Sequence, residues 1–228
     1  MTGRTALAII VPTLDAATTL PASLDALREA HAAFATDVVV VDGGSGDGTP
    51  AVAREHGARV VLAPRGRGMQ LSAGAAAANG EWLLFLHADT VLTAGWSTAA
   101  RAFIAGGAHR AGWFRFRLDD AAPAARRLET LVAWRCRALA LPYGDQGLLL
   151  PRTLYDAVGG YRPLPLMEDV DLVRRLGRRR LAAIGASAVT SAARYRRDGY
   201  IRRTTRNLAC LALWRLGLPP RAIARLYG

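Results

Sequence analysis

The chain contains no lysine, so arginine supplies all 30 of its basic residues. With only 18 acidic residues against them, the formal net charge is +12 at pH 7. Such an excess is compatible with nucleic acid, an anionic membrane surface or a phosphorylated substrate as the partner, and equally with a solvated basic face. Charge by itself therefore does not select a function.

Cysteine is scarce, and long apolar runs are absent. Cys136 and Cys210 lie in helix-like segments without the spacing of a metal site, so we expect buried free thiols. The longest apolar runs, such as 82–86 and 208–214, fall short of the roughly 20 residues that span a bilayer. No small-residue cleavage site follows the short N-terminal apolar run, so we expect no signal peptide and a cytoplasmic protein.

Apolar runs alternate with helical patterns along the first 90 residues. This order predicts a mostly parallel sheet with helices on both faces, an α/β fold. Beyond residue 90 the pattern changes to helices over 95–105, 123–141, 153–158 and 170–176, with strands over 113–118 and 148–150. The expected strands of the first part cover residues 6–11, 38–41, 59–62 and 82–86, and an alanine-rich helix covers 68–79.

A carboxylate, Asp89, follows the apolar strand at 82–86 in the motif FLHADT. A charge at the end of such a strand must be solvated, paired or bound to a metal, because burying it bare costs several kcal/mol or more. A helix N-cap or a turn is the structural alternative. We therefore expect a cation near Asp89.

The glycine-rich loop 42–48 has the spacing of the D-x-G-x-G-x-G loop of Rossmann methyltransferases. In that class the loop follows the first strand, and an acidic residue ends the next strand to hold a ribose. Here a strand at 6–11 already precedes the loop, and the next strand ends in Leu62-Ala63-Pro64-Arg65. The methyltransferase reading therefore fails, and the loop alone indicates a turn between a strand and a helix.

Together, the motifs of the chain resemble the ordered motif set of glycosyltransferase family 2. They are IVPTLD (10–15), VVVVDGGSGDGT (38–49), GRG (66–68), FLHADT (85–90), GDQG (144–147), GGY (159–161) and MEDVD (167–171). The VDGGS and HADT variants resemble a small bacterial branch of that family. The resemblance runs from Ala6 to about Leu181 and implies a GT-A-like fold, as in the nucleotide-diphospho-sugar transferases.

The resemblance implies transfer of a sugar from a nucleotide-sugar donor to a hydroxyl acceptor, with inversion and with a divalent Mg²⁺ or Mn²⁺ ion that neutralises the diphosphate leaving group. Asp89 stands at the last position of the family's Asp-x-Asp signature and would bind the metal. His87 stands where the first aspartate is usual. Gly43 replaces a second aspartate that often reads uracil, which leaves UDP, GDP and other nucleotides open. The residues expected to bind the donor are Pro12, Thr13, Asp15, Asp42, Arg67, His87 and Ala88.

The resemblance assigns the catalytic carboxylates to Asp169, as the general base, and Glu168 beside it, at the start of a helix. Carboxylates that only complement the helix dipole are the structural alternative. Asp145 and Gln146 are expected to line the acceptor or sugar pocket, although a turn before a strand also favours Gly-Asp.

The C-terminal segment 198–228 follows the predicted transferase domain, which covers 1–197. Residues 200–216 form an amphipathic helical pattern rich in arginine, which predicts either an ordinary terminal helix packed on the domain or a helix on an anionic membrane. In the second case the protein would sit at the inner face of the cell membrane and meet a lipid acceptor.

Two other classes stay open. A sugar-phosphate nucleotidyltransferase would share the sheet, but no glycine-rich loop ending in basic residues lies near the N-terminus. A basic nucleic-acid-binding protein would explain the arginines but not the carboxylate and glycine motifs at strand ends. We therefore expect no nucleic-acid partner.

Overall fold

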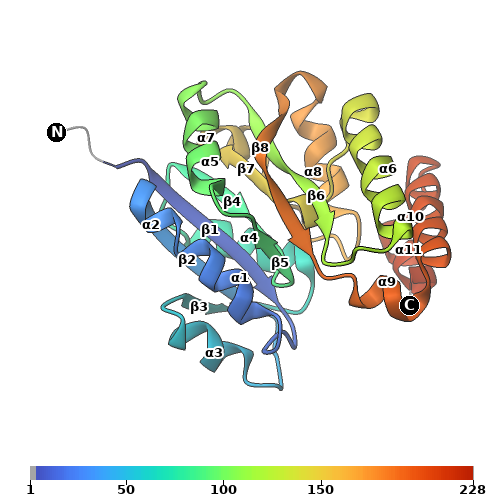
Figure 1. Ribbon diagram of the computed structural model, residues 1–228, viewed down its shortest axis with the longest axis horizontal. Coiled ribbons are helices and arrows are strands. Elements are labelled where there is room, and N and C mark those ends of the chain that lie inside the picture. The colour runs from blue at the N-terminus through green and yellow to red at the C-terminus, as the bar shows by residue number, and fades with distance from the viewer. Residues whose placement is uncertain (1–3, 228) are drawn as a thin grey trace.

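The computed structural model describes residues 4–227. These residues form an eight-stranded sheet in the order β3-β2-β1-β4-β7-β6-β8-β5 (Figure 1). The strands are β1 (Ala6–Thr13), β2 (Ala35–Asp42), β3 (Arg59–Leu62), β4 (Trp82–Phe85), β5 (Thr90–Leu92), β6 (Ala111–Leu118), β7 (Leu148–Pro151) and β8 (Leu181–Thr190).

The first half of the sheet is parallel, as the alternation of strands and helices predicted. β1 pairs in parallel with both β2 and β4, and β2 pairs in parallel with β3. β7 then enters antiparallel to β4 and β6, while β6 and β8 run parallel to each other. The carboxyl ends of β1, β2 and β4 therefore share one edge of the sheet, where ligands of parallel α/β sheets bind.

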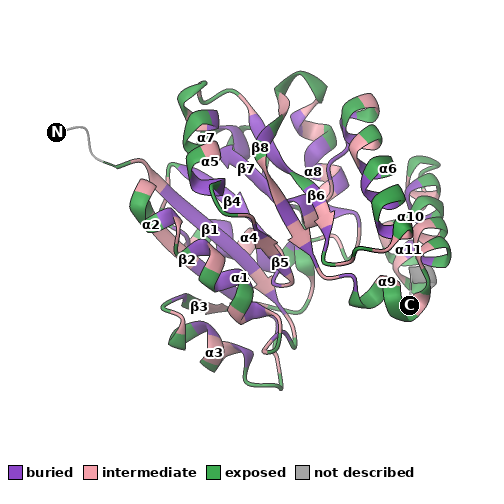
Figure 2. Ribbon diagram, in the orientation of Figure 1, coloured by how far each residue is buried: buried purple, intermediate pink, exposed green. Residues whose placement is uncertain are grey.

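Helices cover both faces of the sheet, and the strands between them are the most buried part of the chain (Figure 2). One face packs against α1 (Leu20–Leu27), α2 (Ala30–Ala33), α3 (Thr49–Glu55) and α5 (Trp96–Ala105). The other face packs against α4 (Arg67–Ala77), α7 (Arg152–Ala157) and α8 (Glu168–Leu176). Because β1 is buried on both faces, its side chains point alternately into the two cores, Ile9 into one and Ile10 into the other.

The remaining helices lie beyond the β6–β8 side of the sheet. They are α6 (Pro123–Leu139), α9 (Ala193–Asp198), α10 (Tyr200–Arg215) and α11 (Pro220–Tyr227), with short 3₁₀ turns η1 (Gly144–Gln146) and η2 (Arg178–Arg180). Cys210, Leu211 and Ile223 of the last two helices share an apolar cluster with Val170 and Val173 of α8. The C-terminal helices are therefore packed on the sheet domain. The domain boundary at residue 197 stays a prediction.

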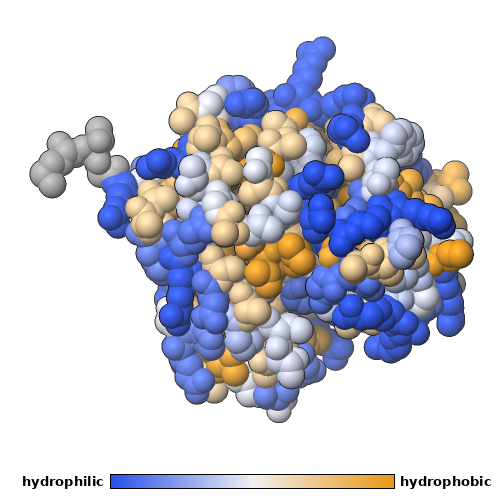
Figure 3. All heavy atoms as spheres, in the orientation of Figure 1, coloured by the Kyte–Doolittle hydropathy of each residue, from blue (hydrophilic) through white to orange (hydrophobic). Residues whose placement is uncertain are grey.

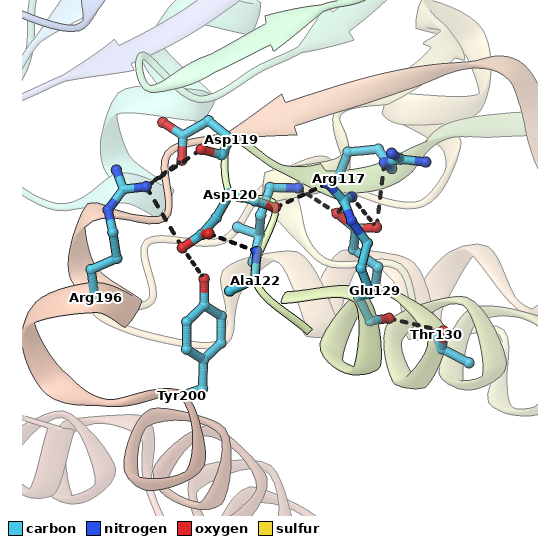
Figure 4. A network of polar contacts seen from close by, with 10 residues as sticks. Arg117, Asp119, Asp120, Ala122, Glu129, Thr130, Arg196 and Tyr200 are labelled. Carbon is cyan, nitrogen blue, oxygen red and sulfur yellow. Dashed lines mark hydrogen bonds and ion pairs between the residues drawn. The ribbon is translucent and has the colours of Figure 1, made fainter. Parts of the chain in front are cut away.

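A polar network fixes the start of this C-terminal unit to the end of β6 (Figure 4). The hydroxyl of Tyr200 donates to the carboxylate of Asp120 at 2.7 Å, and Arg196 lies 3.6 Å from Asp119 and 3.7 Å from Asp120. Glu129 of α6 accepts from Arg126 and from the Leu118 backbone N–H, which joins α6 to the same corner. α9 and α10 are thus held in a fixed position.

Two strands were missed by the sequence patterns. β8 consists largely of small residues, and β5 has only three residues, so neither shows a strong strand signal. Pairing decides both: β8 lies between β6 and β5 with continuous register from Arg115 to Leu118. The two cysteines are free and buried, as expected.

Candidate functional site

Two cavities open at the carboxyl edge of β1 and β4. The larger, about 450 Å³, is lined by the ends of these strands and the start of α4. The smaller, about 140 Å³, lies between η1, the start of α8 and the helices α9 and α10. Both cavities are lined by Arg67, His87, Asp89, Leu166, Glu168, Ser191 and Arg194.

Most of the residues expected to bind the donor line the larger cavity. Pro12, Thr13 and Asp15 come from the end of β1 and the turn after it, and Ala88 follows β4. Asp15 has a positive φ of 49° and its carboxylate accepts from the backbone N–H of Gly46 at 2.9 Å, which joins the β1 turn to the glycine-rich loop. The ends of β1 and β4 therefore line the larger cavity, and the parallel sheet brings these two strand ends together.

Asp42 does not reach either cavity. It is 1 % exposed, and its carboxylate accepts hydrogen bonds from the backbone of Gly44, the backbone and hydroxyl of Ser45, and the hydroxyl of Thr13. The pKa of Asp42 is lowered: burial opposes ionisation, but these hydrogen bonds outweigh it. In this conformation the hydrogen bonds of Asp42 hold the glycine-rich loop 42–48 in place. Contact between the Asp42 side chain and the donor stays a prediction, because Asp42 lines neither cavity.

The side chain of Gln146 is also buried and forms its hydrogen bonds within the protein. It is 1 % exposed; its side-chain oxygen accepts from Arg135 and from the Tyr143 backbone, and its nitrogen donates to the carbonyl of Phe114. The neighbouring Asp145, in contrast, lines the smaller cavity. Of the two acceptor residues expected from the GDQG motif, the structure therefore brings only Asp145 to a cavity.

Three carboxylates line the smaller cavity from different elements: Asp89 after β4, Asp145 in η1 and Asp169 in α8. Asp145 Oδ1 is buried without a hydrogen-bond partner in the described chain. Burial, together with the charges of Asp169 and Asp89, raises the pKa of Asp145 to about 6 although Arg135 and Arg67 oppose the shift. The Asp89 side chain makes no hydrogen bond or ion pair with residues 4–227 either. Two carboxylates thus leave oxygen atoms available to a ligand.

Asp169 is held differently. One of its oxygens accepts from the Gly144 backbone N–H at 2.8 Å and the other from the Val170 N–H at 2.7 Å. Asp169 lines only the smaller cavity, whereas Glu168 lines both. The two backbone bonds hold the Asp169 carboxylate between η1 and the start of α8.

Arg67 lines both cavities together with Asp89, but it forms an ion pair with Glu168. It is the first residue of α4, after Gly66, and its Nη1 lies 3.3 Å from Glu168 Oε1. The Glu168 side chain is 2 % exposed, and burial raises its pKa while Arg67 acts against the shift. Arg67 is 43 % exposed and lines both cavities, so its guanidinium stays accessible at their junction.

His87 is neutral in this environment. Burial lowers its pKa well below the ordinary value, and the charges of Arg67 and Arg194 add to the effect. A neutral imidazole keeps one nitrogen free to accept a hydrogen bond or bind a metal.

Sequence patterns missed one wall of the site. Arg194 and Tyr195 of α9 and Arg203 and Asn207 of α10 line the smaller cavity, but they follow the unpredicted strand β8 and belong to none of the motifs. The arginine-rich composition of this segment was visible, yet it gave no indication which arginines face inward.

The carboxylates at the two cavities could supply only some of the ligands of a divalent cation. In the described part of the chain, no group of three His, Cys, Asp or Glu side chains is arranged to hold a metal ion. Mg²⁺ commonly takes one or two carboxylates and completes its shell with water and substrate phosphates. Asp89 and Asp145, both with available oxygens, are suited to that mode of binding.

Comparison with known proteins agrees with this geometry. The sequence model described as "Glycosyl transferase family 2" matches residues 8–163. No curated protein sequence matches the chain.

Solved structures share the fold at low sequence identity. Glucosyl-3-phosphoglycerate synthase from Mycobacterium tuberculosis, in complex with Mn²⁺, UDP and glucosyl-3-phosphoglycerate, is 20% identical with a TM-score of 0.57, over 83% of this chain and 71% of that one. S. aureus TarS (residues 1–349) is 16% identical with a TM-score of 0.65, over 96% of this chain and 68% of that one. A second TarS structure, in complex with UDP-GlcNAc, has a TM-score of 0.62 at 16% identity, over 82% and 58% of the two chains.

Proposed function

Because the chain belongs to glycosyltransferase family 2, we propose that it moves a sugar from a nucleoside diphosphate sugar to a hydroxyl acceptor with inversion. The larger cavity would hold the donor and the smaller cavity the acceptor. The UDP and UDP-GlcNAc in the complexes of the two structural neighbours support a nucleotide-sugar donor. Gly43 leaves the identity of the nucleotide open.

One observation carries this proposal: the two cavities meet at Asp89 and Arg67, while Asp169 lines the smaller cavity alone. A transfer reaction needs the leaving group and the attacking hydroxyl on opposite sides of the reacting carbon, with a group at the junction that stabilises the leaving charge. The arrangement provides both places.

Leaving-group stabilisation would come from the junction. Arg67 can donate charge-assisted hydrogen bonds to a diphosphate, and the neutral His87 can accept or donate a further one. Asp89, with Asp145 beside it, would hold a divalent cation, and the Mn²⁺ in the mycobacterial complex supports a cation of this type. When bound, such a cation neutralises charge that develops on the diphosphate oxygens.

Activation of the acceptor would come from Asp169. Its carboxylate is oriented by two backbone N–H groups and lines the acceptor-side cavity, as a base must to take the proton of the attacking hydroxyl. Glu168 is tied to Arg67 and nearly inaccessible, so we assign it to positioning Arg67.

Exchanging each aspartate for asparagine separates the two roles. Asp89→Asn should abolish the tightening of nucleotide-sugar binding by Mn²⁺, because an amide is a weak ligand for a hard cation. Asp169→Asn should bind donor and Mn²⁺ like the unaltered chain but turn over roughly 10²- to 10⁴-fold more slowly, the contribution of a positioned base. Calorimetry with a panel of nucleotide sugars, with and without Mn²⁺, measures the first effect, and a hydrolysis or transfer assay measures the second.

Asp156→Asn is the matched control, because Asp156 is exposed and lines neither cavity. It should leave binding and turnover unchanged. Loss of donor binding in a correctly folded Asp169→Asn chain, or full activity in either variant, contradicts the assignment. Binding of no nucleotide sugar at all would remove the proposed function.

The partner proposal extends to an anionic membrane surface as the place of the reaction, with a lipid acceptor. Within residues 4–227, every helix is too short or too polar to cross a bilayer. α10 and its C-cap nevertheless turn apolar side chains outward: in α10, Ile201 is 84 % and Leu208 50 % exposed, and the C-cap Leu216 is 78 % exposed. Residues 199–228 contain arginine but neither Asp nor Glu. Figure 3 shows hydrophobic groups among hydrophilic ones over the C-terminal helices, a composition that suits an anionic interface.

A further inference from the structure

The wall of the smaller cavity formed by α9 and α10 has features that neither the donor nor the base requires. It is contributed by Arg194, Tyr195, Arg203 and Asn207, all outside the segment 8–163 that matches the family. The family match therefore does not indicate what this wall recognises.

Two polar atoms of this wall are buried without a partner in the described chain, Arg203 Nε and Asn207 Oδ1. The Arg203 side chain is only 9 % exposed and is fixed at its other end, where Nη1 lies 3.0 Å from Asp198 Oδ2 and the guanidinium stacks 5.3 Å from the ring centre of Tyr195. A buried polar atom that is left unpaired destabilises the fold. Two of them beside one cavity indicate a polar ligand there.

The charge of the wall is positive. Asp198 is the ion-pair partner of Arg197 at 2.8 Å, Arg203 at 3.0 Å and Arg206 at 3.6 Å, so one carboxylate faces three arginines. Arg194, at the junction of the two cavities, makes no hydrogen bond or ion pair with residues 4–227. Such a surface attracts an anion.

The same cavity is also lined by Asp145 of η1 and Asp169 of α8. A ligand that contacts both groups of residues must present a negative group to α10 and a hydroxyl to Asp169. The volume of about 140 Å³ resembles that of engineered cavities of about 150 Å³ that bind benzene, so it accommodates a small molecule or the end of a larger one.

We propose that the acceptor is an anionic hydroxyl compound, a phosphate ester or a carboxylate, whose charged group is bound by Arg203 and Arg194 and whose hydroxyl donates a hydrogen bond to Asn207 Oδ1. This inference rests on the proposed function, because it names the substrate class of the same site. The anion fixes the acceptor hydroxyl against Asp169, which makes these three residues specificity determinants.

The test compares three ligands with one scaffold: glycerol 3-phosphate, glycerate and neutral glycerol. Their binding to the full chain is measured by calorimetry in the presence of UDP and Mn²⁺, which are added to occupy the diphosphate region, and again without them. We expect the two anions to bind and glycerol not to bind. Loss of a hydrogen bond to a charged group corresponds to about tenfold or more in affinity, so Arg203→Gln and Arg194→Gln should weaken anion binding by at least that factor.

Asn207→Ala keeps the test independent of folding defects. Its side-chain oxygen has no partner in the described chain, so the substitution should leave the melting temperature unchanged or higher. It should weaken binding of the two hydroxy anions, because the oxygen that accepts from a ligand hydroxyl is lost. Arg202→Gln is the matched control, because Arg202 lies on the same helix, is exposed and lines neither cavity. It should bind both anions like the unaltered chain.

Three results would overturn the proposal. Glycerol could bind as tightly as the anions, or the anions could fail to bind at millimolar concentration. Alternatively, Arg202→Gln and Arg203→Gln could reduce the affinity for the anions equally. The proposal would also be overturned if Asn207→Ala and Arg203→Gln bound the anions with wild-type affinity. In that case water or another polar group forms the hydrogen bonds of Asn207 Oδ1 and Arg203 Nε. Failure of nucleotide-sugar binding with intact anion binding would instead count against the proposed function alone. A preference for glycerol 3-phosphate over glycerate identifies the phosphate ester as the favoured class.

Discussion

At the scale of single residues, the ionised form of Asp145 is destabilised in the folded chain. Its Oδ1 is buried without a partner in the described residues, and Asp89 and Asp169 face the same cavity. Burial is the main reason that its pKa rises to about 6 from the ordinary 3.8. The folded chain therefore binds more protons than the unfolded chain between these two values, and its stability falls as the pH rises through that window.

Asp145→Asn should raise the melting temperature at pH 8, where the carboxylate is ionised, and have little effect below about pH 3, where it is largely protonated in both states. A shift of about two pKa units corresponds to roughly 3 kcal/mol, and partial access to the cavity reduces this to about 1–3 kcal/mol. Calorimetry at the two pH values measures the difference. Asp156→Asn should show no such pH-dependent gain, and an Asp145→Asn chain that is less stable at pH 8 would contradict the account.

At the scale of secondary structure elements, close approach of α4 to β1 and β2 places Arg67 at the junction. Gly74 makes this approach possible: an added Cβ would collide with Ile10 Cγ2 and lie 2.7 Å from Val41 Cγ2. Because both side chains belong to the buried core, neither has room to move away.

Gly74→Ala should therefore destabilise the fold by about 1–3 kcal/mol, the usual cost of overpacking, although alanine is normally better than glycine inside a helix by about 1 kcal/mol. Denaturant unfolding measures the change. The control is Gly185→Ala in β8, where a Cβ would meet nothing within 4 Å and the stability should stay equal or rise slightly. If the two substitutions have the same effect, α4 is not held against the sheet as the structure shows.

At the scale of the whole molecule, the positive charge and the exposed apolar groups coincide on the C-terminal helices. We expect vesicles containing phosphatidylglycerol to bind the protein in flotation experiments, and neutral phosphatidylcholine vesicles to bind it less. Raising the salt to about 1 M shortens the screening length to about 3 Å and should release most of the protein. These differences test electrostatic attraction directly.

Substitution separates the apolar part of the same interaction. Ile201→Ser combined with Leu216→Ser should reduce flotation, because both side chains are exposed in solution and would be buried in the interface. Leu62→Ser is the control: Leu62 is 74 % exposed but lies on β3, at the other end of the molecule from α10 (Figure 1). If the unaltered chain, the Ile201→Ser/Leu216→Ser variant and the Leu62→Ser variant float equally, α10 is not the docking surface.

The sequence by itself determined the parallel half of the sheet and the main motif positions. The runs at 6–11, 38–41, 59–62 and 82–86 are long, apolar and rich in branched residues, so their periodicity was sufficient to predict β1 to β4. Strand ends in a parallel sheet share one edge, which also brought Thr13, Ala88 and Asp89 to one cavity.

Only the tertiary structure decided how each motif residue is used. Asp42 and Gln146 are residue types that are common in binding sites, but in the structure their side chains form hydrogen bonds within the protein. These hydrogen bonds depend on the backbone geometry, which cannot be predicted from the order of the residues. β8 becomes a strand because β6 offers it a partner, and the position of β8 then brings Arg203 and Asn207 to the cavity. Contacts between distant segments were the deciding factor, because a side chain's direction is set by what its element packs against.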